Sequence, residues 1–314
     1  MGFSLITALV LAGQIIAADW RVEQVSFAPG SKGAAMVGKA VYLWGEGAHR
    51  DGRKLRAERF GPGGCVWDVN GDGHEDLILH RLPAEMIWME GPRFRTARVI
   101  DREADFADCQ GATLLGRRGV LVTHRGLQVR FYQVPGDARQ AGKWSYREIY
   151  SFYTASYQAG LLVRDVDGDG LPDLLCGNYW IQSPERFELP WRLYAINTYN
   201  ETEESAHMRL AWHGDSLVVS QAEMAKGKVT VFTPAADRKQ LWRERRIAEA
   251  LDHPHAVAWG KDEWIVSEGS RVWLYTGAGR TLLHDGFPLH RLFVAGKGIV
   301  GVGVRGGLRL NPLR

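Results

Sequence analysis

A pair of short apolar runs separated by a turn recurs seven times along this chain, and this repeat constrains the fold more than any other feature. Most pairs are followed by a third apolar run and by a fourth run in which polar and apolar residues alternate. Four short strands in each unit of about 40–45 residues are typical of propeller blades, which stack around an axis to share a core. The paired runs are residues 34–37 with 41–44, 65–67 with 77–79, 112–115 with 120–122, 161–163 with 174–176, 210–212 with 217–219, 256–259 with 264–266, and 292–295 with 299–302.

The repeat predicts an all-β fold, a seven-bladed β-propeller of four-stranded antiparallel blades, in a single domain over residues 19–314. The last unit lacks a fourth strand, whereas residues 20–27 form a strand-like segment without a partner. We expect the strand over residues 20–27 to pair with the last blade and close the ring, which would leave no sheet edge exposed. An open or six-bladed ring is the alternative.

The composition is that of a globular protein, with 45% hydrophobic and 24% charged residues among 314. The net charge of +3 is spread along the chain, so the sequence lacks the basic stripe of a nucleic-acid-binding protein. Residues 1–18 carry no charged side chain, and their apolar run 3–12 and small pair Ala17-Ala18 resemble a secretory signal peptide. We therefore expect a secreted or periplasmic protein, monomeric and without a transmembrane helix once residues 1–18 are removed.

The three cysteines, Cys65, Cys109 and Cys176, lie in apolar runs and lack C-x-x-C spacing. Because their number is odd, we expect buried free thiols rather than a disulfide framework.

Two of the seven turns are long and acidic. The first acidic loop, residues 68–76, reads Asp68-Val-Asn70-Gly-Asp72-Gly-His-Glu-Asp76. The second acidic loop, residues 165–173, reads Asp165-Val-Asp167-Gly-Asp169-Gly-Leu-Pro-Asp173. Oxygen side chains at the first, third, fifth and ninth positions can converge on one hard cation, and the glycines allow a sharp turn. The spacing predicts two structural Ca²⁺ sites, although two ordinary Asp- and Gly-rich turns are the alternative.

The segment from Phe60-Gly61 through the first acidic loop to Leu79 resembles the FG-GAP repeat of integrin-type propellers. Residues 160–175 resemble the same repeat and the related VCBS repeat of bacterial secreted proteins. The resemblance covers about 50 residues and implies a seven-bladed propeller with structural Ca²⁺ in the hairpin loops. The other five turns are short and lack the acidic pattern.

The face opposite the acidic loops is expected to carry any functional site, because the polar ends of strands from several units converge there. His253-Pro-His255 could share a transition metal with His207 or His290, since residues two apart on an extended segment point the same way. Hydrogen bonds between neighbouring blades are the alternative role of these histidines. Glu223 and Glu268 come from adjacent units and could act as paired carboxylates.

Two classes of function stay open at this point. The first is a binding or interaction module for a glycan or protein ligand on the face opposite the Ca²⁺ loops. The second is a carbohydrate-active enzyme, a polysaccharide lyase or hydrolase that uses the His and Glu residues of that face. No G-x-S-x-G, H-E-x-x-H, P-loop or Rossmann motif points to a particular reaction.

Overall fold

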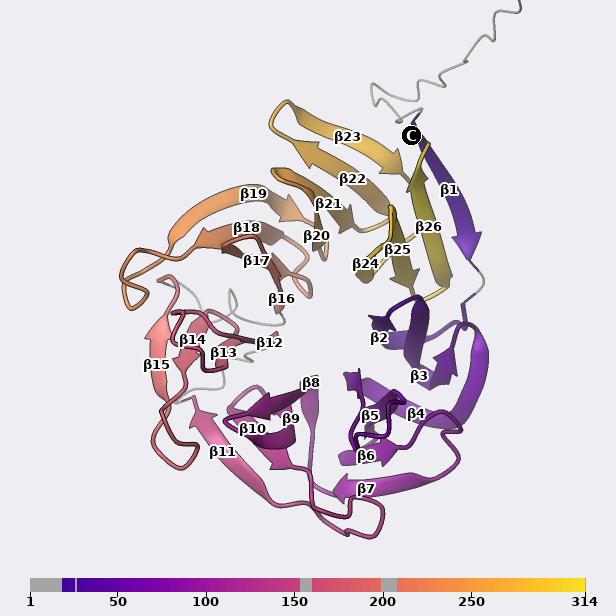
Figure 1. Cartoon of the computed structure of the whole chain (residues 1–314). Helices are drawn as coiled ribbons and strands as arrows, with labels where there is room; N and C mark the ends of the chain where they lie inside the picture. Colours follow the sequence, from indigo (N-terminus) through magenta and orange to yellow (C-terminus); the bar gives the residue numbers. More distant parts are fainter. Residues whose placement is uncertain (1–18, 26, 153–159, 199–207, 314) are drawn as a thin grey trace, which may run out of the picture.

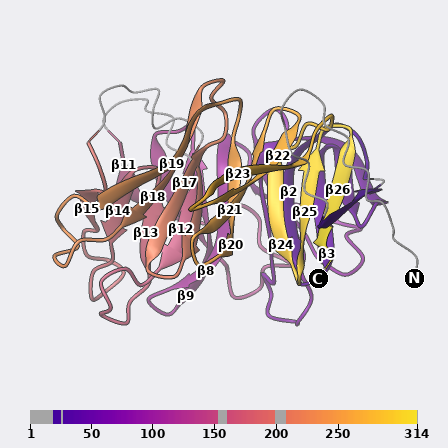
Figure 2. The same cartoon turned by 90° about the horizontal axis from the view of Figure 1, so that it is seen from above.

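The computed structural model describes residues 19–25, 27–152, 160–198 and 208–313, and in these residues the regular elements are all β-strands. The strands form six sheets placed as blades around a central axis (Figure 1). In the view turned by 90°, the sheets form a thick disc in which many strands run between its two faces (Figure 2). The chain is therefore an all-β propeller.

Four of the sheets contain four strands that follow one another in the sequence from the axis outward. They are β8 (Phe106–Leu114), β9 (Arg117–His124), β10 (Gln128–Gln133) and β11 (Tyr146–Ser151); β12 (Leu161–Arg164), β13 (Asp173–Cys176), β14 (Tyr179–Gln182) and β15 (Arg192–Ala195); β16 (Met208–His213), β17 (Ser216–Gln221), β18 (Gly227–Thr233) and β19 (Arg243–Leu251); and β20 (His255–Gly260), β21 (Glu263–Glu268), β22 (Arg271–Thr276) and β23 (Gly279–His284).

A fifth sheet combines both ends of the chain. Its strands are β24 (Arg291–Ala295), β25 (Gly298–Gly303), β26 (Gly306–Pro312) and β1 (Trp20–Val25). β1 pairs antiparallel with β26, with Trp20 opposite Pro312 and Val25 opposite Gly307. This strand ends at Val25, two residues before the end of the predicted segment 20–27, and Ser26 lies outside the described residues.

The sixth sheet has six strands: β2 (Ser31–Val37), β3 (Ala40–Arg50), β4 (Arg53–Trp67), β5 (Asp76–Arg81), β6 (Glu85–Met89) and β7 (Ala97–Asp101). Its central strand β4 pairs through its first half with β3 and through its second half with β5. The pairing register of β4 with β5 shifts between Phe60 and Gly64. The strand β4 nevertheless stays extended through this segment, where one unit was expected to end. The two halves pack on each other, with Tyr42 and Trp44 in one cluster with Leu79.

The prediction of seven four-stranded blades is therefore wrong: the structure has six blades. Each of the seven predicted pairs of apolar runs does form an antiparallel hairpin. The first two hairpins belong to one sheet because β4 continues through residues 60–64. Glycines allow this passage, since a Cβ on Gly63 would lie 2.2 Å from the carbonyl oxygen of Phe106, and one on Gly64 would lie 2.8 Å from Trp44 Cε2.

Apolar side chains fill the spaces between neighbouring sheets. Trp88 and Ile78 of the six-stranded sheet pack with Val122 and Tyr132 of the next sheet, and all four are fully buried. Truncation of a tryptophan such as Trp88 to alanine would cost about 3–5 kcal/mol of stability.

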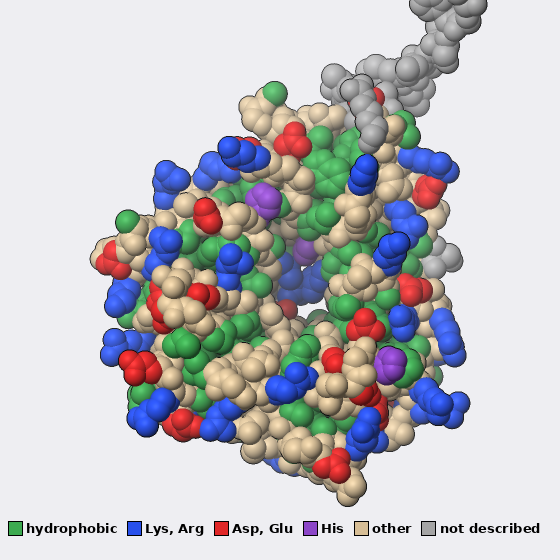
Figure 3. All heavy atoms as spheres, viewed as in Figure 1, with side chains coloured by type: hydrophobic (Ala, Val, Ile, Leu, Met, Phe, Trp, Pro, Cys, Tyr) green, Lys and Arg blue, Asp and Glu red, His purple; other side chains and the backbone are tan. Residues whose placement is uncertain are grey.

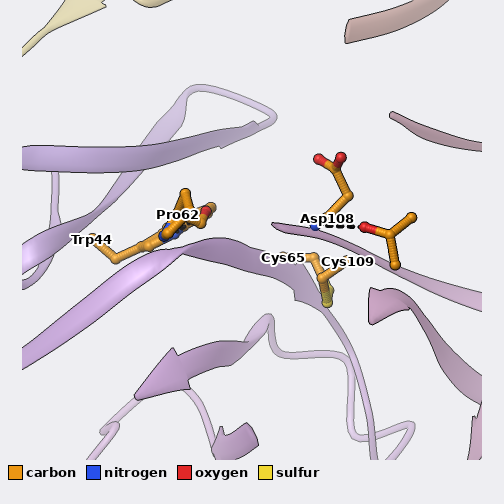
Figure 4. The surroundings of a disulfide bond; sticks show 6 residues. Trp44, Pro62, Cys65, Asp108 and Cys109 are labelled. Carbon is orange, nitrogen blue, oxygen red and sulfur yellow. Dashed lines mark hydrogen bonds between the residues drawn. A yellow bond between two sulfur atoms is a disulfide. The ribbon is translucent and has the colours of Figure 1, made fainter. Parts of the chain in front are cut away.

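The same two sheets are joined by a disulfide between Cys65 on β4 and Cys109 on β8 (Figure 4). The expectation of three free thiols is wrong for this pair, because strands that are neighbours around the axis bring the two cysteines to a Cα–Cα distance of 5.2 Å. Cys176 is free and fully buried, as expected, and burial raises the pKa of its thiol.

Within the described part of the chain, no helix is long and apolar enough to span a membrane. The predicted signal peptide, residues 1–18, lies outside the described residues.

Candidate functional site

The first acidic loop connects Trp67, the last residue of β4, to Asp76, the first residue of β5. The Asp68 carboxylate accepts hydrogen bonds from the backbone N–H groups of Gly71 at 2.7 Å and Gly73 at 2.9 Å. Both glycines have positive φ, 75° and 84°, which is the conformation that the sequence pattern predicts for a sharp turn.

The second acidic loop, between β12 and β13, repeats this geometry. Asp165 accepts hydrogen bonds from Gly168 N at 2.7 Å and from Gly170 N at 2.9 Å. These glycines also have positive φ, 81° and 85°. The two loops therefore share one backbone conformation, as their shared sequence pattern indicates.

The last aspartate of each loop is fully buried at its base. Asp76 accepts hydrogen bonds from Val69 N at 3.0 Å and Gly91 N at 2.7 Å. Asp173 accepts hydrogen bonds from Val166 N at 3.1 Å and from Trp180 Nε1 at 2.9 Å. Burial raises the pKa of both carboxyl groups to about 6, against the effect of these donors.

The two loops differ in how their carboxylates are arranged. In the second loop, one carboxylate oxygen from each of Asp165, Asp167 and Asp173 lies within 4.8 Å of the others. Among the described residues, this is the one cluster of three or more His, Cys, Asp or Glu side chains that could hold a metal ion. Asp169 is outside this group and accepts a hydrogen bond from Leu171 N at 2.8 Å. Ca²⁺ takes six to eight oxygen ligands, and three convergent carboxylates can supply part of that set.

In the first loop, Asp72 already has other partners. Asn70 Nδ2 donates to Asp72 Oδ2 at 3.0 Å, and Arg139 Nη2 lies 3.4 Å from the same oxygen. Arg139 comes from the turn after β10 and also pairs with Glu90. The guanidinium therefore supplies positive charge beside Asp72, whereas the carboxylates of Asp165, Asp167 and Asp173 form no ion pair among the described residues, so the second loop is the better cation site.

Figure 3 shows Lys or Arg, His and Asp or Glu side chains in the opening at the centre of the disc. The inner strands β8, β16, β20 and β24 border this opening (Figure 1). Arg209, near the start of β16, donates from Nη1 to Asp108 Oδ1 near the start of β8 at 2.8 Å. Arg209 Nη2 also lies 3.5 Å from Glu223 Oε1. Since β12 lies between β8 and β16, this contact spans the inner edge of a whole blade.

The starts of the inner strands therefore meet at one end of the opening, which we call the start face. Another contact supports this placement, because His255, the first residue of β20, accepts at Nδ1 a hydrogen bond from Leu292 N in β24 at 3.2 Å. The acidic loops follow the last residues of the inner strand segments, Trp67 and Arg164, and so lie at the opposite end.

The predicted histidines are separated by the structure into two environments. His253 is exposed, has a φ of +49°, and its Nδ1 lies 2.6 Å from Asp252 Oδ1. His255 is buried and close to His290 and Arg291, and burial followed by the charges of Arg291 and Arg209 lowers its pKa well below the usual value. The adjacent proline and the positive φ turn His253 away from the direction that an extended segment would give it. His207 lies outside the described residues.

The two predicted glutamates have separate partners. Glu223 Oε1 lies 3.5 Å from Arg209 Nη2. Glu268 accepts a hydrogen bond from Trp273 Nε1 at 3.0 Å and lies 3.5 Å from Arg271 Nη1, both within its own sheet. Neither contact brings the two carboxylates together.

Sequence reasoning missed the charged residues Asp108, Arg209 and Arg291 at the start face. A signal was available, because Arg209 and Arg291 each directly precede an apolar inner-strand run, Leu-Ala-Trp and Leu-Phe-Val. An arginine at the axis-facing start of such a run is placed where other blades can reach it.

No protein-family profile and no curated protein matches the sequence. Several solved structures are similar in fold. YCF48 bound to D1 peptide has a TM-score of 0.58 and 10% identity, covering 96% of this chain and 99% of that chain. The mitotic checkpoint complex contains a chain with a TM-score of 0.55 and 13% identity, covering 99% of this chain and 98% of that chain.

The extracellular domain of a putative hybrid two-component system from B. thetaiotaomicron has a TM-score of 0.57 and 11% identity. The match covers 92% of this chain and 39% of that chain. At these identities the similarity concerns the fold alone, and it places this chain among the β-propellers.

Proposed function

We propose that this protein is a secreted propeller that binds a peptide segment of a protein ligand at its start face. The observation that carries the proposal is the concentration of charged and polar side chains from several inner strands at that end of the central opening. Arg209 Nε and His290 Nε2 are buried there without a hydrogen-bond partner among the described residues. Side chains that converge from separate blades with free bonding capacity suit the recognition of a polar ligand.

A peptide is favoured over a glycan by two considerations. Charged groups of both signs at the start face suit the charged ends and side chains of a peptide. In addition, one of the structures with the same fold holds a bound peptide. No observation favours the alternative of a carbohydrate-active enzyme, since Glu223 and Glu268 face different cations.

We further infer that the second acidic loop holds a structural Ca²⁺ ion, in the manner of FG-GAP and VCBS repeats. The convergent carboxylates of Asp165, Asp167 and Asp173 support this inference. The disulfide between Cys65 and Cys109 supports a location outside the cytoplasm, because such bonds persist in oxidising compartments.

Binding of the labelled protein, as residues 19–314, to parallel peptide and glycan arrays tests the proposal. Glu223→Arg reverses a charge at the start face and is expected to change the dissociation constant for bound peptides by about tenfold or more. Lys261→Glu, an exposed charge in the turn between β20 and β21 at the opposite end, is the matched control and should change it less than about twofold. Binding to glycans alone, or equal effects of the two variants, would contradict the proposal.

A further inference from the structure

Arg291 is a cation at the start face that the described chain leaves without an anion. It is the half-buried first residue of β24, and it lies close enough to Arg209, Asp108 and Glu223 to interact with their charges. Within the described residues, Arg291 Nη1 donates a hydrogen bond to the backbone carbonyl of His290 at 3.3 Å. No carboxylate of the described chain lies within ion-pair distance of it. A guanidinium has five N–H donors, so most of its bonding capacity is unused.

Neighbouring polar atoms also lack partners. His290 Nε2 and Arg209 Nε are buried and lack a hydrogen-bond partner in the part of the chain that the structure describes. Buried polar atoms normally have hydrogen-bond partners, so these atoms have bonding capacity that a ligand could use.

The charges around Arg291 favour an anion. Burial, followed by the positive charge of Arg209, lowers the pKa of Arg291 to about 9, while Asp108 and Glu223 oppose this shift. Asp108 is already bonded to Arg209 and therefore only partly offsets the charge of Arg291. Burial and the two arginines also lower the pKa of His290 to about 4, so its imidazole is neutral near pH 7.

From this geometry we infer that the start face binds a carboxylate group of its ligand, held by the Arg291 guanidinium beside His290. The inference deepens the proposed function, since the C-terminus of a bound peptide is one source of such a group. A small free carboxylate is the other source. The planar guanidinium matches a carboxylate with two parallel hydrogen bonds. A dianion such as phosphate is less favoured, because Asp108 and Glu223 lie close to the same opening.

The test uses a pool of random N-acetylated hexapeptides made with a free C-terminal carboxylate, and the same pool with a C-terminal amide. Binding is measured by fluorescence anisotropy, and the effects of sodium acetate and inorganic phosphate on the melting temperature are measured in parallel. The variants are Arg291→Met and the control Arg309→Met, which removes an exposed arginine from β26 of the same sheet. Arg291→Lys, which keeps the charge but not the two-pronged geometry, serves if Arg291→Met does not fold.

We expect the amidated pool to bind the original protein about tenfold more weakly than the acid pool does. Arg291→Met should bind the acid pool about tenfold more weakly than the original protein does. Arg309→Met should bind both pools as the original protein does. Without ligand, Arg291→Met should melt no lower than the original protein, since it removes an unpaired buried charge. If both pools bind equally and Arg291→Met has no effect, peptide binding stands and the carboxylate inference falls.

If neither pool binds but acetate raises the melting temperature in an Arg291-dependent way, the inference holds for a small carboxylate and the proposed function falls. Stabilisation by phosphate and not by acetate would overturn the inference, as would the absence of any Arg291-dependent effect.

Discussion

Arg209 of β16 and Asp108 of β8 form an ion pair at the rim of the central opening, with 2.8 Å between Nη1 and Oδ1. The two residues are 101 positions apart in the sequence, and the sheet of β12–β15 lies between their strands. Asp108 also accepts a hydrogen bond from Gly160 N at the beginning of that intervening sheet. One carboxylate thus ties together the inner edges of three blades.

We predict that Asp108→Asn lowers the free energy of unfolding by about 2 kcal/mol, because it leaves Arg209 with a weaker partner in a site that is mostly closed to solvent. The side chains of Arg209 and Asp108 are only 13% and 17% exposed. Urea unfolding followed by tryptophan fluorescence measures the change. The control Glu249→Gln removes one partner of a surface pair with Arg246, with Glu249 61% exposed, and should cost less than about 0.5 kcal/mol. Equal effects of the two substitutions would show that the Arg209–Asp108 pair adds no stability of its own.

The disulfide between Cys65 and Cys109 closes a loop of sequence separation 44 between neighbouring sheets. Its removal in the double variant Cys65→Ala/Cys109→Ala is expected to cost about 3–4 kcal/mol, mainly by freeing the unfolded chain. Equilibrium urea unfolding with and without a thiol reductant measures this effect. The original protein should unfold at lower urea when reductant is present, whereas the double variant should not respond.

Cys176→Ala is the matched control, since it removes a buried cysteine that is not in the disulfide. This variant should keep the response to reductant. An original protein whose unfolding ignores reductant would contradict the prediction.

For the second acidic loop, we expect Ca²⁺ to raise the melting temperature and a chelator to lower it. A site filled at a hundredfold excess over its Kd adds about 2.7 kcal/mol to the free energy of unfolding. Asp167→Asn removes one of the three convergent carboxylates and should abolish most of this effect. Asp72→Asn in the first loop should change it much less, because Asp72 is already paired with Arg139.

Differential scanning calorimetry with Ca²⁺, Mg²⁺ and chelator makes these comparisons. Melting that does not change under chelation would remove the calcium proposal, and a larger effect of Asp72→Asn would assign the site to the first loop instead.

The acidic loops were the part of the structure that the sequence predicted best. Their conformation depends on local residues, because Asp68 and Asp165 bind backbone N–H groups three and five positions later and the glycines supply positive φ. Whether a cation binds depends on distant residues as well. Arg139 reaches the first loop from 67 positions away, and local sequence gives no indication of it.

The blade count failed for a related reason. Phe60-Gly-Pro-Gly-Gly64 has the composition of a turn, yet β4 passes through it extended, because glycines let the chain lie against Trp44 and Phe106. Similarly, the pairing of Cys65 with Cys109 depends on which strands are neighbours around the axis. That pairing could have been found, since both cysteines lie on the inner strands of successive hairpins. The ion pair of Arg209 with Asp108 could not, since it depends on the diameter of the ring.

His124 at the end of β9 is buried, and its Nδ1 has no hydrogen-bond partner among the described residues. Burial, together with Arg130 and Arg125, lowers its pKa to about 4, against the opposing charges of Asp105 and Asp101. Between pH 6.5 and 4 the unfolded chain therefore binds a proton at His124 that the folded chain does not. His124 thus adds stability that is complete above about pH 6.5 and is lost as the pH falls towards 4, by up to about 3 kcal/mol.

We expect His124→Gln to reduce the fall in the free energy of unfolding between pH 7 and 4.5, as measured by urea unfolding at a series of pH values. Other titrating groups, such as His255 and His290, act equally in both proteins and cancel in the comparison. Thr123→Ala is the control, because Thr123 is an adjacent buried residue that does not titrate, so its replacement should lower stability by the same amount at each pH. If His124→Gln also changes the free energy of unfolding by the same amount at each pH, then His124 is protonated as readily in the folded chain as in the unfolded one. In that case the burial of His124 does not suppress its charge.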